Sequence, residues 1–172
     1  MLLQREPFAA FTQAQVAVEA GVRQSHLTYY FPTRNDLLRG VAQAAKEEAV
    51  AQSREDSSQR GPSLRQLRQR VGSQTGSPAL PRLMVALTTA SDEDANLRPW
   101  LEHFERDSKA RLKAALAALG LHVRAAPLDL CHAALVGAAL LNFQQRSASA
   151  NRRAVRVCTL AFDRLVADAR RV

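Results

Sequence analysis

The chain has 172 residues, 47% of them hydrophobic and 23% charged, with 24 Lys and Arg against 16 Asp and Glu and a net charge of +8. This composition excludes a wholly disordered, collagen-like or linker-dominated chain and fits one domain or a small pair, and the positive charge favours an anionic partner. Two cysteines are too few for a disulfide framework, so a reducing, cytoplasmic compartment is expected.

Helical patterns follow one another along the chain, and no alternating strand pattern competes with them. Thr12 is predicted to cap the first helix, Gly21 to end it, and Thr33 to cap the third, with Asp36 in its first turn. Polar breaks fall at 53–63 and 73–78. The predicted helices cover about residues 13–20, 24–30, 34–53, 64–71, 80–87, 97–119 and 127–143, and a last helix capped by Asn151. The sequence therefore predicts an all-α fold.

The segment FTQAQVAVEAGVRQSHLTYYF, residues 11–31, has the spacing of a helix-turn-helix. Ala17 supplies a small residue where two helices would cross, and Gly21 can adopt the positive φ of the turn. Val22 would be buried in the turn, and Leu27 would point inward from the second helix. The alternative is a helical hairpin that only packs.

The stretch AGVRQSHLTYYFPTRNDLL, residues 20–38, resembles the recognition helix and the next helix of the TetR family of bacterial transcription regulators. The specific likeness covers about residues 2–45. It implies a DNA-binding head over 1–45 and a helical ligand-binding and dimerisation domain over 46–172. The residues that carry it are Ala20, Gly21, Val22, Leu27, Tyr29, Phe31, Thr33, Arg34, Asp36, Leu37 and Leu38.

Two positions depart from the family pattern. Thr28 stands where the family usually has Tyr, a common phosphate contact. Leu2 and Leu3 align with the end of the family's first helix, so most of that helix is expected to be missing, and Pro7 replaces the usual Gly after it.

The outward positions of residues 24–30 would face the major groove of DNA. Amide, hydroxyl and imidazole groups can read base edges, which selects Gln24, Ser25 and His26. Hydroxyl, amide and charged groups can hold phosphates, which selects Thr12, Gln13, Thr28, Tyr29, Tyr30 and Arg34. Core packing is the alternative for Tyr29.

A largely apolar pocket with a few polar groups is expected in the C-terminal domain, and plain helix-bundle core is the alternative for its apolar members. Its candidate residues are Met84, Leu87, Trp100, His103, Phe104, Leu112, Cys131, Leu135 and Asn142. A dimer interface is expected because the 128–143 helix is apolar on more faces than one small domain covers; an intrachain core is the alternative. Its candidate residues are Ala134, Gly137, Ala138, Val155, Cys158, Phe162 and Leu165.

Neither metal-binding nor catalytic spacing is present, so no metal, cofactor or enzymatic activity is expected. The longest uncharged run, 130–145, is shorter than a membrane-spanning helix needs, so no membrane partner is expected.

The resemblance implies a homodimeric, one-component regulator, a repressor in most of this family. It would bind a palindromic operator in double-stranded DNA and respond to a small, largely apolar or acidic ligand. The alternative is a helical dimer that senses a ligand or a protein partner without specific DNA binding. The distribution of charge does not decide between these two functions. The helix-turn-helix segment, residues 12–39, has a net charge of only +1, while residues 146–172 have a net charge of +5.

Overall fold

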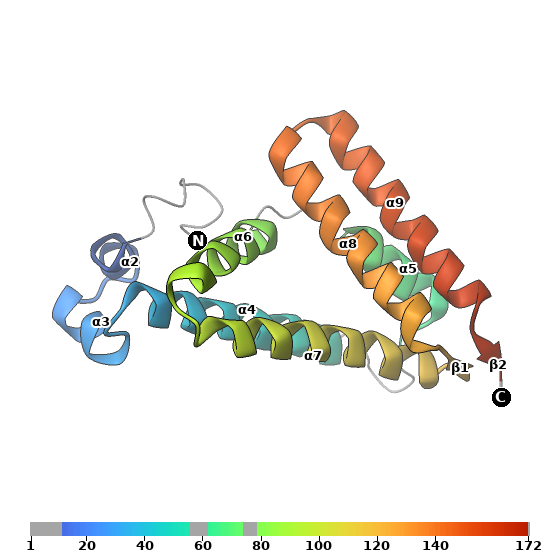
Figure 1. Ribbon diagram of the computed structural model, residues 1–172, viewed down its shortest axis with the longest axis horizontal. Helices are drawn as coiled ribbons and strands as arrows, with labels where there is room; N and C mark the ends of the chain where they lie inside the picture. The colour runs from blue at the N-terminus through green and yellow to red at the C-terminus, as the bar shows by residue number, and fades with distance from the viewer. Residues whose placement is uncertain (1–11, 56–61, 74–78, 172) are drawn as a thin grey trace. The chain divides into compact units, whose positions relative to one another are not determined.

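The computed structural model describes residues 12–55, 62–73 and 79–171 (Figure 1). These residues form helices separated by short turns, which confirms the all-α prediction. In chain order the elements are α2 (Gln13–Glu19), α3 (Gln24–Tyr30), α4 (Arg34–Glu55), α5 (Leu64–Ser73), α6 (Ala79–Glu93), α7 (Leu97–Ala117), β1 (Leu121–His122), α8 (Ala125–Gln145), α9 (Ala148–Ala167) and β2 (Arg170–Arg171).

One short strand pair was not predicted. β1 pairs with β2 in antiparallel register, with Leu121 opposite Arg171 and His122 opposite Arg170. Two-residue strands are too short to leave an alternating pattern in the sequence. The pair ties the segment after α7 to the end of α9.

The start of α9 also differs from the prediction, because Ser147 rather than Asn151 caps it. The Ser147 side chain accepts a hydrogen bond from the Ala150 amide at 3.1 Å, and Asn151 lies in the first turns of the helix. Arg146 ends α8 in the left-handed conformation with φ of 44°, so the next helix begins at once. Ser and Asn are both favoured as helix caps and both occur in this segment, so the sequence did not show that the helix begins at Ser147 rather than at Asn151.

The chain divides into two compact units, one of residues 1–53 with 78–101 and the other of residues 54–77 with 102–172. The first thus groups α2, α3 and α4 with α6, a different division from the expected domains 1–45 and 46–172. That functional boundary stays a prediction.

The first unit is built on a core where α4 meets α6. Leu38, Leu87 and Leu97 are fully buried there, and Val16, Leu27 and Phe31 of the helix-turn-helix pack against the same cluster. The inward residues of α2 and α3 therefore anchor the helix-turn-helix on α4.

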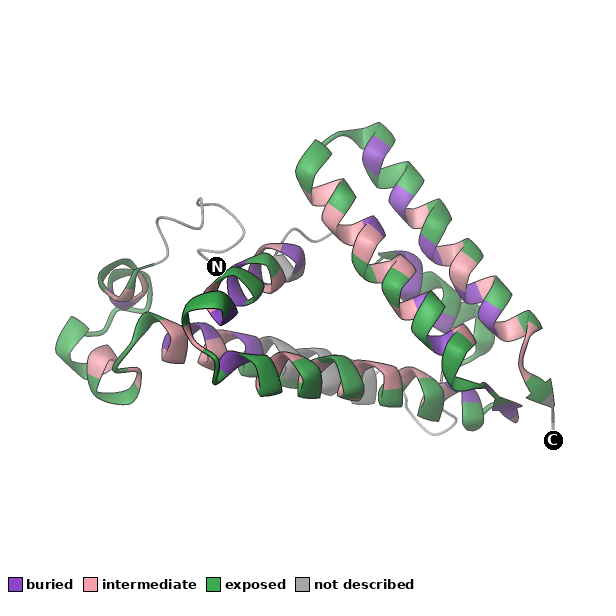
Figure 2. Ribbon diagram, viewed as in Figure 1, coloured by how far each residue is buried: buried purple, intermediate pink, exposed green. Residues whose placement is uncertain are grey.

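The second unit is built on the antiparallel hairpin of α8 and α9, with α5 packed on α9. Figure 2 shows buried positions recurring along one side of α9. Arg68 of α5 pairs with both carboxylate oxygens of Asp163 on α9, at 2.7 and 2.8 Å. The core of this unit contains Leu67, Val71, Leu116, Leu121, Val123, Leu128, Cys131, Ala138, Ala154, Cys158, Phe162 and Leu165.

Candidate nucleic-acid interface

The turn between α2 and α3 has the geometry of a helix-turn-helix. The Thr12 hydroxyl caps α2 by accepting from the Gln15 amide at 3.3 Å, and Ala17 is 2% exposed where the helices meet. Gly21 has φ of 66°, a conformation that favours glycine. The prediction that Val22 is buried is wrong, because its side chain is 39% exposed. Its backbone instead closes the turn, since its amide donates to the Ala17 carbonyl at 3.0 Å.

The joint between α3 and α4 is held by side chains on both sides of Pro32. The ring of Phe31 lies directly on Gly40, where a Cβ would overlap it. Gln13 Nε2 donates to the carbonyl oxygens of Phe31 and of Pro32, the second at 3.2 Å. Both amide hydrogens of Gln13 are thus engaged, so its predicted phosphate contact would have to break one of these bonds.

The first turn of α4 carries a capping box. The Asp36 amide donates to Thr33 Oγ1 at 3.1 Å, and the Thr33 amide donates to Asp36 Oδ2 at 3.0 Å. Asp36 Oδ2 also accepts the Thr33 hydroxyl at 2.6 Å, and Arg39 pairs with the same carboxylate. The Thr33 hydrogen bonds, helped by Arg39, lower the pKa of Asp36 below its ordinary 3.8. The box fixes where α4 starts after α3.

The outer face of α3 presents polar and aromatic side chains. Tyr29 is 79% exposed and Tyr30 is 64% exposed, so the alternative of core packing for Tyr29 is wrong. The rings of His26 and Tyr30 stack edge to face with their centroids 5.3 Å apart, and the rings of Tyr29 and Tyr30 do so with their centroids 5.2 Å apart. With exposed Ser25 they make one contiguous face, which we call the α3 face. Exposed rings with polar tips are typical of a contact surface.

The other predicted DNA-binding residues surround this face. Gln24 and Arg34 are exposed, Thr28 is half-buried, and Thr12 is exposed although its hydroxyl caps α2. All nine predicted DNA-binding residues thus lie on α2, on α3 or at the adjoining helix starts. Their contacts with DNA stay a prediction.

The predicted pocket residues divide between the two units. Met84, Leu87 and Trp100 belong to the first unit, where Leu87 is fully buried and Trp100 packs on the core. In the second unit Leu112, Cys131 and Leu135 belong to the core, and Phe104 is half-buried. The two polar candidates have partners within the chain. His103 is exposed, with its Nε2 3.4 Å from Asp107 Oδ2, and Asn142 Nδ2 donates to Asn151 Oδ1 at 3.2 Å.

Most of the predicted dimer residues on α9 face the chain's own core. Cys158, Phe162 and Leu165 are at most 1% exposed, Ala138 of α8 is 7% exposed, and Val155 is half-buried near Gly72 of α5. These residues follow the intrachain alternative, because α5 and α8 already cover this side of α9. Ala134 and Gly137 are only half-buried.

The residues that could meet a partner lie on another side of the hairpin. Leu130 is 67% exposed, Leu141 is 52% exposed, and Leu160 of α9 is 61% exposed. The exposed and half-buried apolar residues that we call the hairpin face are Leu130, Ala133, Ala134, Gly137 and Leu141 of α8 with Val157 and Leu160 of α9. The spacing of 130, 134, 137 and 141 is the helical signal that could have identified it.

α8 is also long and apolar enough, by length and composition, to cross a membrane. Only 17% of its most apolar window is buried. The core helix of a soluble protein passes the same test, so this is weak evidence for a membrane span. The exposed apolar surface still has to be covered by something.

The two cysteines have little nucleophilic character. Both are buried, and burial raises the pKa of Cys131 and raises that of Cys158 to about 11. Burial also lowers the pKa of the half-buried His132 imidazole next to Cys131. Within residues 12–55, 62–73 and 79–171, no three His, Cys, Asp or Glu side chains are grouped so that they could hold a metal ion.

Comparison with known proteins identifies the N-terminal part of the chain. Residues 1–41 match the family model of bacterial regulatory proteins of the tetR family, which describes an N-terminal helix-turn-helix domain. Neither the curated proteins nor the solved structures include a significant match to the chain. The matched segment contains α2, α3 and the start of α4, the same residues that form the helix-turn-helix and its capping box.

Proposed function

We propose that the chain is a DNA-binding transcriptional regulator of the tetR family, whose model matches residues 1–41 and whose members are regulators and not enzymes. It acts as a homodimeric one-component repressor in the cytoplasm. It binds a palindromic operator, and a small apolar or acidic ligand bound outside the head modulates that binding.

The α3 face is the observation that supports operator binding best. A short helix that exposes hydroxyl, imidazole and phenol groups can reach base edges and phosphates in a major groove. Ser25, His26 and Gln24 lie in the first turn of α3, the part of a recognition helix that contacts bases in this motif. Tyr29 and Tyr30 follow one turn later, where their hydroxyls could bind the phosphate backbone.

The hairpin face supports the homodimer. A two-fold axis through it would bring two copies of α8 and α9 together, and a two-fold dimer reads a palindromic site. Small side chains at Ala133, Ala134 and Gly137 allow helices to approach closely. A Cβ on Gly137 would meet no atom within 4 Å beyond its chain neighbours and the backbone of its own helix, so the space above it is open to a partner.

Charge supports an acidic ligand or partner for the second unit. That unit carries 17 Lys and Arg against 8 Asp and Glu, whereas the first unit carries 7 against 8. A small anion would therefore be attracted to the second unit rather than to the head.

Fluorescence anisotropy with DNA from around the chain's own promoter tests the proposal. We expect saturable binding that weakens with salt and prefers that DNA over a shuffled sequence of equal length. Equal affinity for both DNAs would contradict operator recognition and would favour a helical sensor without specific DNA binding.

A further inference from the structure

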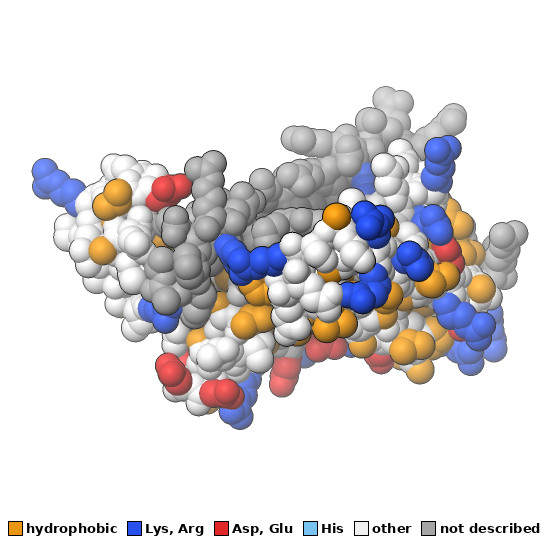
Figure 3. Space-filling view, turned by 90° about the horizontal axis from the view of Figure 1, so that it is seen from above, with side chains coloured by type: hydrophobic (Ala, Val, Ile, Leu, Met, Phe, Trp, Pro, Cys, Tyr) orange, Lys and Arg blue, Asp and Glu red, His pale blue; other side chains and the backbone are white. Residues whose placement is uncertain are grey.

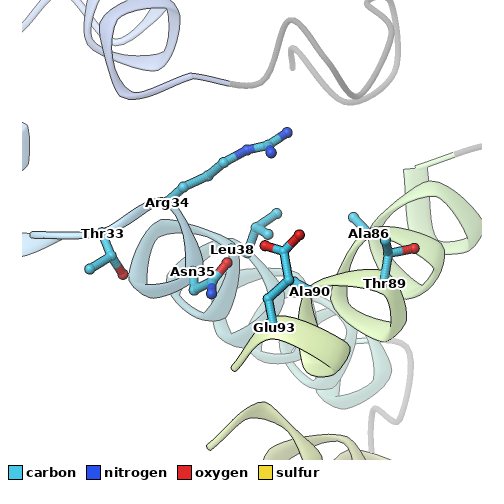
Figure 4. Close-up of a pocket in the computed structure, with 8 residues that line it drawn as sticks. All are labelled: Thr33, Arg34, Asn35, Leu38, Ala86, Thr89, Ala90 and Glu93. Atoms are coloured by element: carbon cyan, nitrogen blue, oxygen red, sulfur yellow. The ribbon is translucent and has the colours of Figure 1, made fainter. Parts of the chain in front are cut away.

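The first unit contains a pocket of about 300 Å³ between the start of α4 and the end of α6 (Figure 4). Its floor is apolar, formed by Leu38 and Ala86, which are buried, and by the half-buried Ala90. Its rim is polar. The rim residues are Thr33, Arg34, Asn35, Thr89 and Glu93.

Apart from Arg34, the rim residues that can donate use a donor within the chain, and Asn35 and Glu93 keep an acceptor. Asn35 Nδ2 donates to Asp94 Oδ2 at 3.4 Å, which leaves the Asn35 amide oxygen as an acceptor. The Thr33 hydroxyl donates to Asp36, and the Thr89 hydroxyl donates to the Val85 carbonyl at 3.0 Å. The Glu93 carboxylate makes no hydrogen bond or ion pair with another residue in the described part of the chain.

The acceptors lie over the apolar floor. Asn35 of α4 and Glu93 of α6 line the same pocket as Leu38, and in Figure 4 the Arg34 side chain extends away from them. An ammonium group has three donors and no acceptor, so it matches this pair of acceptors. A carboxylate or phosphate ligand would instead meet the charge of Glu93.

We propose that this pocket binds a small primary amine in its ammonium form, with a short apolar body on Leu38, Ala86 and Ala90. Glu93 and Asn35 would hold the ammonium group by charge-assisted hydrogen bonds. The volume is at the lower end of the range for small-molecule sites, which suits a ligand of one ring or a short chain.

A consequence for regulation rests on the proposed function. Only Phe31, Pro32 and Thr33 separate α3 from α4, and the pocket includes Thr33, Arg34 and Asn35. An amine that joins this turn to α6 would change the free energy of any movement of α3 needed for DNA binding. The two ligands would then be coupled, and each would change the affinity of the other by the same factor.

Calorimetric titration of the full chain with 2-phenylethylammonium tests the site, with 2-phenylethanol as a neutral ligand of the same shape. We expect saturable binding of the amine and binding of the alcohol weaker by about tenfold or more. Glu93→Gln should remove most of this preference, whereas Glu102→Gln, which removes an exposed charge outside the pocket, should keep it. Ala90→Leu should weaken both ligands by filling the floor.

Several outcomes would overturn the site: no saturable amine binding, equal affinities for amine and alcohol, or a Glu93→Gln variant that binds the amine as the unaltered chain does. Anisotropy with promoter DNA, with and without the amine, tests the regulatory consequence separately. Unchanged DNA affinity at saturating amine refutes the coupling. If the chain binds no DNA selectively, the proposed function fails, and the calorimetric result still decides whether the amine site exists.

Discussion

Tyr30 is one exposed side chain through which the proposed operator binding can be tested. Its ring is in edge-to-face contact with both His26 and Tyr29, and 64% of the residue is exposed. These contacts fix the ring on the α3 face without burying it. The residue therefore contributes little to the core and is free to contact a phosphate or a base.

We predict that Tyr30→Ala weakens operator binding by about tenfold, the loss expected for one good contact. The dimer should remain intact, because Tyr30 lies outside the hairpin face. Anisotropy measures the first effect, and light scattering coupled to size-exclusion chromatography measures the second. Tyr30→Phe separates the hydroxyl from the ring. Unchanged operator affinity in Tyr30→Ala would contradict the assigned role of the α3 face.

Asp36 is a single residue whose charge contributes to the stability of the fold. Its pKa is lowered in the folded chain by the Thr33 hydrogen bonds and Arg39, so its charged form stabilises the fold. This contribution is present above the ordinary carboxyl pKa near 3.8 and is lost as the pH falls through the lower folded value.

Asp36→Asn should therefore lower the free energy of unfolding by about 1 kcal/mol at pH 7, the usual cost of losing a helix cap. Urea unfolding followed by circular dichroism measures the loss. The difference between the two chains should shrink as the pH falls below 4, because the native carboxylate is then protonated as well. A difference that stays constant down to pH 2.5 would show that its charge does not matter.

Local patterns at this scale were predictable, and distant contacts were not. The Thr12 cap, the Gly21 turn and the pairing of Thr33 with Asp36 follow from spacings of a few residues. The engaged amide of Gln13 depends on carbonyls 18 and 19 residues away, which no local pattern reveals. The exposure of Val22 likewise depends on how little the neighbouring helices cover the turn.

Within the described residues the helices were predictable in number, but α6 extends to Glu93, beyond the predicted end near residue 87, and the buried sides of the helices were not predictable. The stripe of Cys158, Phe162 and Leu165 correctly indicated burial on α9. It could not show that α5 and α8 of the same chain supply the partner surface. α8 is apolar nearly all round, so its sequence does not distinguish the core side from the hairpin face.

Gly137 tests the hairpin face. Apart from its chain neighbours and the backbone of its own helix, no atom lies within 4 Å of the place where its Cβ would be, so the monomer can accept a side chain there. We predict that Gly137→Glu yields a monomer with unchanged helix content, because a charge would be forced into an apolar helix interface. Light scattering gives the mass, and circular dichroism gives the helix content.

Gly137→Ala is the matched control, since it adds one methyl group and should preserve the dimer. If the Gly137→Glu chain stays folded and dimeric, the dimer interface does not include the hairpin face around Gly137. A monomeric variant should also bind its operator far more weakly, since two half-sites would no longer be held by one assembly.

At the scale of the whole molecule, charge is separated from the DNA-binding motif. No Asp or Glu occurs between Asp129 and Asp163, while this stretch contains Arg146, Arg152, Arg153 and Arg156, all exposed. Figure 3 shows Lys and Arg side chains among apolar ones over α8 and α9. Arg68 and Arg164 are neutralised by Asp163 and Asp168, so within α9 the uncompensated charge lies in its first half.

Arg152 and Arg156 have no ion-pair partner among the described residues, so their charges act mainly through the long-range field. That field extends about 30 Å in 0.01 M salt but only about 8 Å in 0.15 M salt. We therefore predict that a double Arg152→Gln, Arg156→Gln chain binds random-sequence DNA about tenfold more weakly in 0.01 M salt. Its affinity for the operator in 0.15 M salt should change by less than about threefold, because contacts of the α3 face supply it.

Lys113→Gln, which removes one exposed charge from α7, is the control for a general effect of net charge. Anisotropy over a series of salt concentrations gives both affinities and their salt dependence. If α9 touched the phosphates of the operator itself, the double variant would instead bind the operator more weakly at 0.15 M. Its plot of log affinity against log salt would also become shallower, by about 0.9 for each phosphate that the variant no longer neutralises. That result would place α9, rather than α3 alone, in the DNA interface.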